Sequence, residues 1–378
     1  MIRVGFVYNH EAAHQVRHSA GVIAPLSRIS GIEVSVLATS QALMNAVRGV
    51  VPPDTDCIYR RLDLPVWHRP IVRAGNLFMP FGRLDHLFTH REVLRTFDVL
   101  VVTEGTSLFL RKLGGFDHVK FIRIDHGAGD RATGYRPSFA GNDLVIVAGE
   151  KQRRRFVEQG ILRPDQVAVA GYPKFDTVDF TRSKLFADDK PVVLYNPHPA
   201  AHLSSWYRMG RAVLEFFAGH PDYNLIFAPH VMLFRRRVQI SPEFRAVRWR
   251  ADIPRKYFGC PNILIDTGSR ASIDMTYTLA ADIYLGDVSS QVYEFLAGGP
   301  RPCVFLDAHG ARWQGNPDYA FWNFGPVVGG TADLAAALKA DHARYRAVQE
   351  AAVADTFSRT EAPASARAAR AVGVLLGR

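Results

Sequence analysis

The stretch YLGDVSSQVYEF, residues 284–295, places a carboxylate and two hydroxyls where a buried strand runs into a helix. Its first residues are apolar and strand-sized, and QVYEF continues with helical character. Asp287, Ser289 and Ser290 therefore follow the strand directly. Ligands of open parallel α/β sheets lie outside the carboxyl ends of the strands. The stretch thus predicts both a strand-helix unit and a functional site at its junction.

The same order of strand and helix runs through the whole chain. Apolar runs such as IRVGFVYN, IEVSVLAT and DVLVVTEG alternate with helical segments, and a second series that includes PVVLYNP and ADIYLGD begins after the polar stretch 176–190. This order predicts parallel sheets with crossover helices. A chain of 378 residues also exceeds the size at which one core usually keeps growing. We expect two doubly wound Rossmann-like domains facing a central cleft: residues 1–180, residues 188–350, and a helical tail at 351–378.

Composition limits the class of protein. With 48% hydrophobic and 22% charged residues the chain is an ordinary globular protein. Three widely spaced cysteines give neither a metal motif nor a disulfide framework, which favours a reducing cytoplasm. A strand begins at once without a signal sequence, and the longest apolar runs are strand-sized. We expect a cytoplasmic protein, with a peripheral position at the inner face of the plasma membrane as an option.

The net charge of +10 is partly concentrated in KQRRRF (151–156) and FRRRV (234–238). Such a balance indicates a polyanionic partner: nucleic acid, an anionic membrane surface or a phosphate-rich small substrate. A solvated helix face is the alternative for each run. The absence of zinc-finger, RNP and helix-turn-helix motifs argues against nucleic acid.

Polar residues follow several predicted strands. RIDHG leaves His126 and Gly127 after a strand of the first domain, and IFAPH leaves His230 after one of the second. LYNPHP adds Asn196 and His198. A lone histidine at a strand end is often structural, but several such residues are expected to converge at the carboxyl edge of a sheet.

The serine junction has two interpretations. Backbone N–H groups and serine hydroxyls at a helix N-terminus bind phosphate, whereas a serine in the same place often serves only as an N-cap. Glu294 lies one turn beyond Ser290 and either accepts hydrogen bonds from ribose hydroxyls or is an exposed helix residue.

The stretch NHEAAHQVRH places His10, His14 and His18 at intervals of four, on one face if the segment is an α-helix. It contains no HExxH motif and no evident acidic third ligand, so we predict no metal site. The stretch either meets the acceptor at the rim of the cleft or forms a plain surface helix.

Residues LAADIYLGDVSSQVYEFLAGGPRPCVFLD resemble the signature of the CDP-glycerol glycerophosphotransferase family, the teichoic acid polymerase-like enzymes. Further segments resemble that family in the same order: DHG at 125–127, GYPKFD at 171–176, YNPHP at 195–199 and FAPH at 227–230. The resemblance implies a GT-B fold. It also implies transfer of phosphoglycerol from CDP-glycerol to a hydroxyl of a membrane-linked or cell-surface glycan or lipid, with release of CMP.

By position, His126 resembles the catalytic base and His230 the histidine that contacts the donor phosphates. The resemblance also implies that donor phosphate and ribose are held by Asp287, Ser289, Ser290 and Glu294. We expect Gly286, Asn196 and His198 to bind the donor as well, from their places at or after strand ends. The acceptor side is expected to include Asp125, Gly127, His10 and His14. No cluster of metal-binding carboxylates is visible, so the predicted reaction requires no metal and no cofactor besides the nucleotide-activated donor.

Two departures keep other functions open. The family's first motif commonly reads Trp-His-Gly-Thr-Pro, whereas this chain reads IDHGAGD, and YNPHPAAH replaces the more usual Ala-Pro-Thr sequence. One alternative is a GT-B glycosyltransferase that uses a nucleotide-activated sugar for envelope or capsule polysaccharide. Another is a non-catalytic nucleotide- or polyanion-binding protein, which would need neither histidine. The basic, Ala-rich tail is either a helix that returns to the first domain or a membrane-surface helix.

Overall fold

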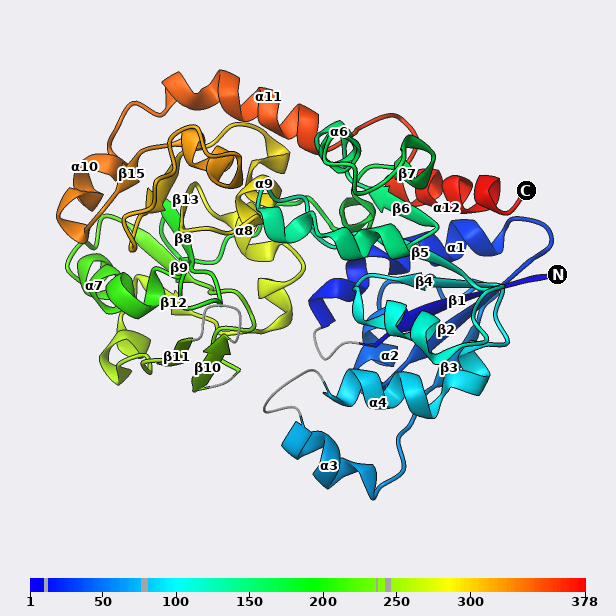
Figure 1. Ribbon diagram of the computed structural model, residues 1–378. Coiled ribbons are helices and arrows are strands. Elements are labelled where there is room, and N and C mark those ends of the chain that lie inside the picture. Colours follow the sequence, from blue (N-terminus) through cyan, green and yellow to red (C-terminus); the bar gives the residue numbers. More distant parts are fainter. Residues whose placement is uncertain (10–12, 76–80, 236, 242–245) are drawn as a thin grey trace. The chain divides into compact units, whose positions relative to one another are not determined.

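The computed structural model describes residues 1–9, 13–75, 81–235, 237–241 and 246–378 (Figure 1). The chain forms two compact units. The first unit contains Met1–Ala128, Tyr135–Val178 and Ala354–Arg378, and the second contains Gly129–Gly134 and Asp179–Val353. A short piece of the N-terminal half of the sequence, residues 129–134, therefore folds with the second unit.

A seven-stranded parallel sheet in the order β3-β2-β1-β4-β5-β6-β7 forms the centre of the first unit. Its strands are β1 (Ile2–Tyr8), β2 (Ile32–Ala38), β3 (Ile58–Arg61), β4 (Val99–Val102), β5 (Lys120–Ile124), β6 (Leu144–Val147) and β7 (Val167–Val169). Its α-helices are α1 (Ile23–Ser27), α2 (Gln41–Arg48), α3 (His68–Gly75), α4 (Phe81–Thr89), α5 (Arg91–Leu94), α6 (Glu150–Glu158) and α12 (Ala364–Leu375). All residues of β4 and β6 are buried, as expected for strands that helices cover on both faces.

A six-stranded parallel sheet in the order β12-β9-β8-β13-β14-β15 forms the centre of the second unit. Its strands are β8 (Val192–Asn196), β9 (Asn224–Phe227), β12 (Ile263–Ile265), β13 (Ile283–Gly286), β14 (Cys303–Leu306) and β15 (Val327–Val328). The α-helices are α7 (Trp206–Ala218), α8 (Thr276–Ala280), α9 (Gln291–Phe295), α10 (Leu334–Leu338) and α11 (Arg346–Thr356), whose last residues belong to the first unit. An antiparallel hairpin, β10 (Val238–Ser241) and β11 (Ala246–Trp249), is separate from this sheet.

Short 3-10 helices fill many of the connections. They are η1 (Ala13–His18), η2 (Ala20–Val22), η3 (Thr106–Leu113), η4 (Ala132–Gly134), η5 (Pro137–Gly141), η6 (Pro164–Gln166), η7 (Pro173–Thr177), η9 (Arg255–Gly259), η10 (Arg270–Ser272), η11 (Leu296–Gly298), η12 (Pro317–Phe324), η13 (Thr331–Asp333) and η14 (Ala343–Tyr345).

Both sheets have the doubly wound strand order, in which the direction of winding reverses beside the first strand. The reversal lies between β1 and β4 in the first unit and between β8 and β13 in the second. The predicted α/β fold with two doubly wound parallel sheets is therefore confirmed. Because ligands of such sheets bind at this switch point, the residues that directly follow these strands are the candidates for a functional site.

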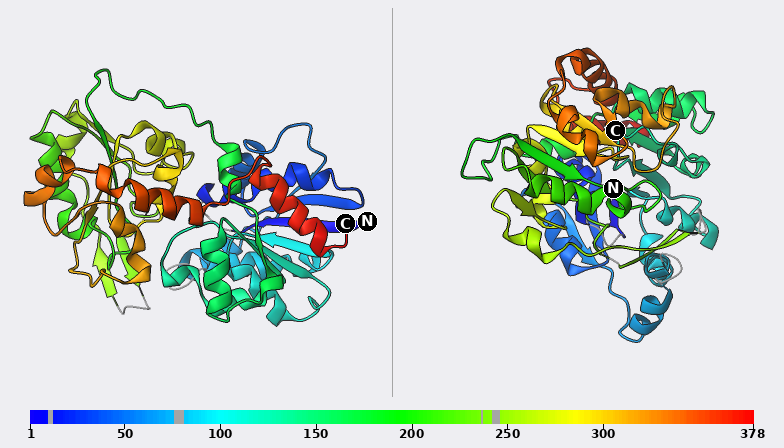
Figure 2. Two further views of the ribbon diagram at one scale, coloured as in Figure 1. Left: turned by 90° about the horizontal axis from the view of Figure 1, so that it is seen from above. Right: turned by 90° about the vertical axis from the view of Figure 1, so that its left-hand side faces the viewer.

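The C-terminal helix α12 belongs to the first unit and lies beside α1 (Figure 2). Ala368, Ala369 and Val372 are buried in the core that includes the strands of the seven-stranded sheet. The backbone N–H of Ser365, in the first turn, donates to Asp176 at 2.6 Å. The apolar face of the tail is thus covered by protein, which does not leave it available as a membrane-surface helix. In the part of the chain that the structure describes, no helix is long and apolar enough to cross a bilayer.

Candidate functional site

The carboxyl ends of three neighbouring strands are joined in the second unit. Asn196, the last residue of β8, pairs with Gly286, the last residue of β13. Its side-chain Nδ2 donates to the carbonyl oxygen of Ala228, after β9, at 2.6 Å, and its Oδ1 accepts from the Ser289 hydroxyl at 3.1 Å. The buried Asn196 amide therefore fixes the two loops on either side of it. Position 286 requires glycine for a steric reason, since a Cβ there would lie 2.5 Å from the Tyr284 ring.

Asp287 is fully buried beneath the loop that follows β8. Its carboxylate accepts from the backbone N–H groups of His198 at 2.9 Å and Ser205 at 2.6 Å, and from the Ser205 hydroxyl at 2.9 Å. Burial raises the pKa of Asp287 to about 6, although the hydrogen bonds from Ser205 and His198 lower it in part. The carboxylate thus points at the loop, and Asp287 positions His198.

The two serines of the junction have different environments. Ser289 is buried, donates to Asn196 and accepts from the Gln291 N–H at 3.3 Å, so it has the capping role. Ser290 is exposed at the N-cap position of α9 and makes no side-chain capping bond. Since α9 has only five residues, its dipole is small and the hydroxyl and N–H groups matter more. Glu294 is buried, which makes the exposed-glutamate interpretation wrong.

His198 and His230 have the same local geometry on adjacent strands. Each follows a proline, and the Nδ1 of each accepts from the backbone N–H two residues further on, at 3.0 Å from Ala200 and 3.2 Å from Met232. An imidazole that accepts at Nδ1 carries its proton on Nε2, so we assign this tautomer to both neutral rings. The ring centroids are 6.3 Å apart. The second unit therefore presents two Nε2–H donors side by side.

Arg131 lies against the ring of His198. Its Nη1 is 3.2 Å from Nε2 of His198. Burial, and then the positive charge of Arg131, lower the pKa of His198 well below its usual value, so the ring is neutral. Arginine keeps its positive charge near neutral pH and its N–H groups donate in charge-assisted hydrogen bonds, so the place beside Arg131 and His198 is suited to an anionic oxygen.

Sequence reasoning missed Arg131 because it lies in the N-terminal half of the chain, four residues beyond Gly127. The structure assigns residues 129–134 to the second unit. Within that unit, the Tyr293 hydroxyl donates to the buried Asp130 carboxylate at 2.6 Å, which anchors the segment to α9. The sequence signal was a basic residue close behind the DHG motif.

His126 follows β5 in the first unit and has a fixed tautomer. Its Nδ1 lies 2.7 Å from the carbonyl oxygen of Thr103, which only accepts, so Nδ1 carries the proton and Nε2 keeps a lone pair. The Gln152 amide supports this loop, donating to the carbonyl of Gly127 at 2.8 Å and to Asp125 at 3.2 Å. The partly buried imidazole thus has the tautomer that a general base requires.

The histidine-rich stretch differs from its expected form. His10 lies outside the described residues, and His14 and His18 lie in η1 rather than in an α-helix. With about three residues per turn, residues four apart no longer share a face, so the predicted histidine face is wrong for this pair. His18 is buried, with its ring centroid 5.1 Å from that of Tyr172 and 6.2 Å from that of His126. Among the described residues, no group of three or more His, Cys, Asp or Glu could hold a metal ion.

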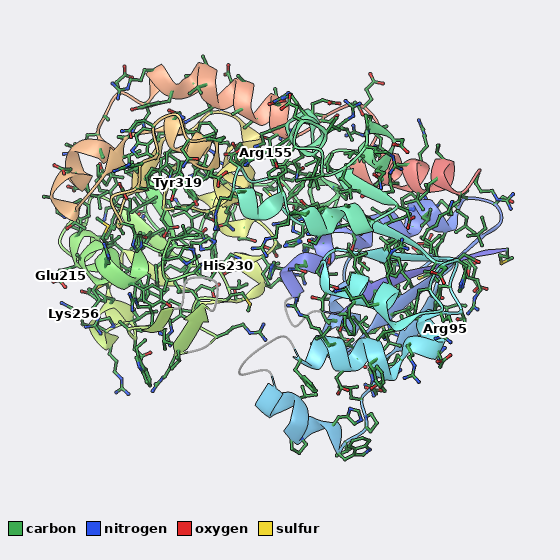
Figure 3. All side chains as sticks on the ribbon, viewed as in Figure 1. Arg95, Arg155, Glu215, His230, Lys256 and Tyr319 are labelled. Carbon is green, nitrogen blue, oxygen red and sulfur yellow. The ribbon has the colours of Figure 1, made fainter. Side chains whose placement is uncertain are left out.

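The arginines of the basic run 151–156 make ion pairs and ring contacts within the first unit. Arg154 forms an ion pair with Asp355 at 2.6 Å, and Arg153 with Glu150 at 3.4 Å. Arg155, labelled in Figure 3, places its guanidinium 4.2 Å from the centroid of the Tyr135 ring. This run therefore pairs within the fold. Of the second run, Arg236 lies outside the described residues, and Arg237 is 3.4 Å from Asp252.

No protein-family model matches the chain, and no curated protein matches it in sequence. Several solved structures do match along its whole length. MnaA from S. aureus in complex with UDP has 15% identity and a TM-score of 0.64, over 100% of this chain and 97% of that chain. UDP-GlcNAc 2-epimerase from Neisseria meningitidis bound to UDP-GlcNAc has 15% identity and a TM-score of 0.59, over 100% of both chains.

A third match is the wall teichoic acid polymerase TagF, with 13% identity and a TM-score of 0.58, over 100% of this chain and 88% of that chain. A TagF variant soaked with CDPG has 14% identity and a TM-score of 0.57, over 99% and 88%. At these identities the likeness concerns the fold. The chain has the GT-B fold, with two Rossmann-like domains.

Proposed function

We propose that the chain is a transferase that binds a nucleotide-activated donor through its diphosphate and passes the activated group to an acceptor hydroxyl. The observation that carries this proposal is the convergence of Arg131, His198 and His230 in the second unit, where a permanent cation and two Nε2–H donors lie together. Phosphate oxygens accept such donors in charge-assisted hydrogen bonds. The permanent charge of arginine makes the site suited to an anion at any pH near neutrality.

CDP-glycerol is the donor that we propose. The acceptor hydroxyl oxygen would attack the phosphorus that carries glycerol and form a new P–O bond, while the bond to the bridging oxygen breaks and CMP leaves. His126 would take the hydroxyl proton on Nε2, because its Nδ1 proton is held by Thr103. Arg131, His198 and His230 would stabilise the negative charge that shifts to the phosphate oxygens. The motif resemblance and the TagF variant soaked with CDPG support this choice. For the acceptor we propose a membrane-linked or cell-surface glycan or lipid.

A nucleotide-activated sugar is the second candidate donor. It is favoured by the full-length likeness to an epimerase structure that contains UDP-GlcNAc, together with the IDHGAGD and YNPHPAAH departures. In both proposals the donor's diphosphate binds to Arg131, His198 and His230. They differ in the nucleoside and in the group beyond the second phosphate.

A thermal-shift titration with CDP-glycerol, CMP, UDP-GlcNAc, UDP and a CMP-sugar discriminates between these donors. A ligand at about 100 times its dissociation constant adds about 2.7 kcal/mol to the free energy of unfolding. We expect CDP-glycerol and CMP to stabilise the protein more than the other nucleotides. A preference for a UDP- or CMP-sugar would favour the second candidate. Donor binding without acceptor-dependent CMP release from any tested hydroxyl would favour a non-catalytic binding protein.

A further inference from the structure

Strand β11 of the β10–β11 hairpin exposes two apolar side chains, those of Val247 and Trp249, to solvent. Its antiparallel register pairs Val238 with Trp249, and directly opposed residues lie on the same face of a sheet. Val247 and Trp249 are two residues apart in β11 and share that face. They are 56% and 74% exposed, respectively. A β-ribbon in a water-soluble domain ordinarily turns such a face inward, so this orientation requires an explanation.

The same segment carries much of the positive charge of the chain. Residues 235–256 contain eight Arg and Lys against two acidic residues, in a chain whose net charge is +10. Arg248 lies between Val247 and Trp249 in the sequence, so its side chain is on the opposite face of β11. Arg237 and Arg250 both bridge to the exposed Asp252, at 3.4 Å and 3.0 Å, whereas Arg248 makes no salt bridge with any described carboxylate. Segment 235–256 thus combines an exposed tryptophan with an excess of basic over acidic residues in its sequence.

We propose that this hairpin binds the surface of an anionic membrane, with Val247 and Trp249 inserted at the headgroup level. Tryptophan prefers the boundary between headgroups and acyl chains, and each arginine near an anionic surface adds an attraction. A soluble polyanion would be held by the arginines alone and would leave the valine and tryptophan in water. A second copy of the chain would bring two strongly basic hairpins together, which like-charge repulsion opposes.

This inference goes beyond the proposed function, because it does not depend on the identity of the donor. Binding with inserted side chains also differs from a purely electrostatic contact. Lipid binding through charge alone disappears at high salt, where the Debye length falls to about 3 Å at 1 M. Insertion of Val247 and Trp249 would leave a residual affinity that salt does not remove.

The test is flotation of the full chain with vesicles of phosphatidylcholine alone or with phosphatidylglycerol added, over a range of salt concentrations. We expect binding to the anionic vesicles that weakens with salt but keeps a residual component. Trp249→Ala should reduce the partition coefficient by about tenfold or more, from the loss of a large buried apolar side chain. Arg248→Gln should reduce it about fivefold, and only at low salt. Brominated lipid should quench a tryptophan signal that Trp249→Phe removes.

Trp67→Ala is the matched control, since Trp67 is 67% exposed but lies in the first unit. We expect this variant to bind vesicles like the wild type, and thermal melts would show that each variant is folded. The proposal is overturned by equal binding to neutral and anionic vesicles, by no binding to either, or by a loss of binding in Trp67→Ala instead of Trp249→Ala. It is also overturned if soluble polyphosphate competes fully and Trp249→Ala has no effect, or if Trp249→Ala instead abolishes a dimer seen in sedimentation.

Discussion

His198 and His230, which follow neighbouring strands, each accept the same type of backbone hydrogen bond, and their ring centroids are 6.3 Å apart. In each case the N–H two residues further on donates to Nδ1 and leaves the proton on Nε2. This equivalence gives both rings a donor toward a ligand, and it leads to the first prediction. His230→Ala should weaken donor binding and lower turnover together, because the ring would contact the phosphate in the ground state and in the transition state.

Binding isotherms and steady-state kinetics with CDP-glycerol check this prediction. His220→Ala is the matched control, since His220 is a partly buried histidine of the second unit whose Nδ1 bonds to the Phe216 carbonyl at 2.7 Å. An unchanged donor affinity in His230→Ala would show that this ring does not hold the donor.

Replacement of His126 should affect catalysis and spare donor binding. We expect His126→Ala to lower turnover by roughly 100- to 10,000-fold, the range typical for the loss of a general base. Donor affinity should stay near the wild-type value, because the donor residues belong to the second unit. Turnover at saturating donor, together with a donor titration, separates the two quantities. Turnover near the wild-type level would mean that another group takes the proton.

Arg131→Met should weaken donor binding by about 10- to 100-fold, as the loss of a hydrogen bond to a charged group costs about 1.5 to 3 kcal/mol. The variant keeps most of the side-chain length and removes the charge. Arg211→Met, at an exposed position of α7, removes an equal charge away from the site and should bind the donor normally. Equal weakening in the two variants would indicate a general electrostatic effect instead of a direct contact.

Substitution of the two serines should affect different properties, stability for Ser289 and donor binding for Ser290. Ser289→Ala should lower the free energy of unfolding by about 1 kcal/mol, since it removes a cap and leaves Asn196 without a partner for Oδ1. Ser290→Ala should leave stability unchanged and weaken donor binding, because its hydroxyl is exposed and makes no capping bond. Denaturant unfolding and donor titration of both variants check the pair. The opposite pattern would reject the assignment of the cap to Ser289.

Asp287 should make stability depend on pH in the acid range. Burial raises its pKa from 3.8 to about 6 in the folded protein, so the folded protein binds this proton more tightly than the unfolded chain. The stabilising contribution is therefore full below pH 3.8 and is lost as the pH rises through about 6, a change of about 3 kcal/mol.

Asp287→Asn removes that proton and should flatten the decline in unfolding free energy over this window, whatever its effect on absolute stability. Urea unfolding at several pH values measures the slope. Asp222→Asn, at an exposed position, should keep the wild-type slope. A wild-type slope in Asp287→Asn would contradict the raised pKa.

The sequence by itself determined the fold class and many of the candidate positions. Strands such as VLVV at 99–102 and LVIV at 144–147 are short apolar runs, and their character depends on residues that are adjacent in the chain. The order of strands and helices then restricts the topology, because parallel strands need crossover connections. Residues that directly follow such strands, including Asn196, His198 and Asp287, could be found by the same local rule.

Tertiary structure decided what those residues do. Asp287 follows a strand as expected, but its burial under the loop of residues 197–205 gives it a positioning role that no local pattern encodes. The division between Ser289 and Ser290 depends on Asn196, which is far away in sequence. Arg131 lies beside His198 because residues 129–134 pack with the second unit. Sequence patterns report local backbone preference and burial, whereas hydrogen-bond partners and proton affinities depend on groups that only the folded chain brings within a few ångströms of one another.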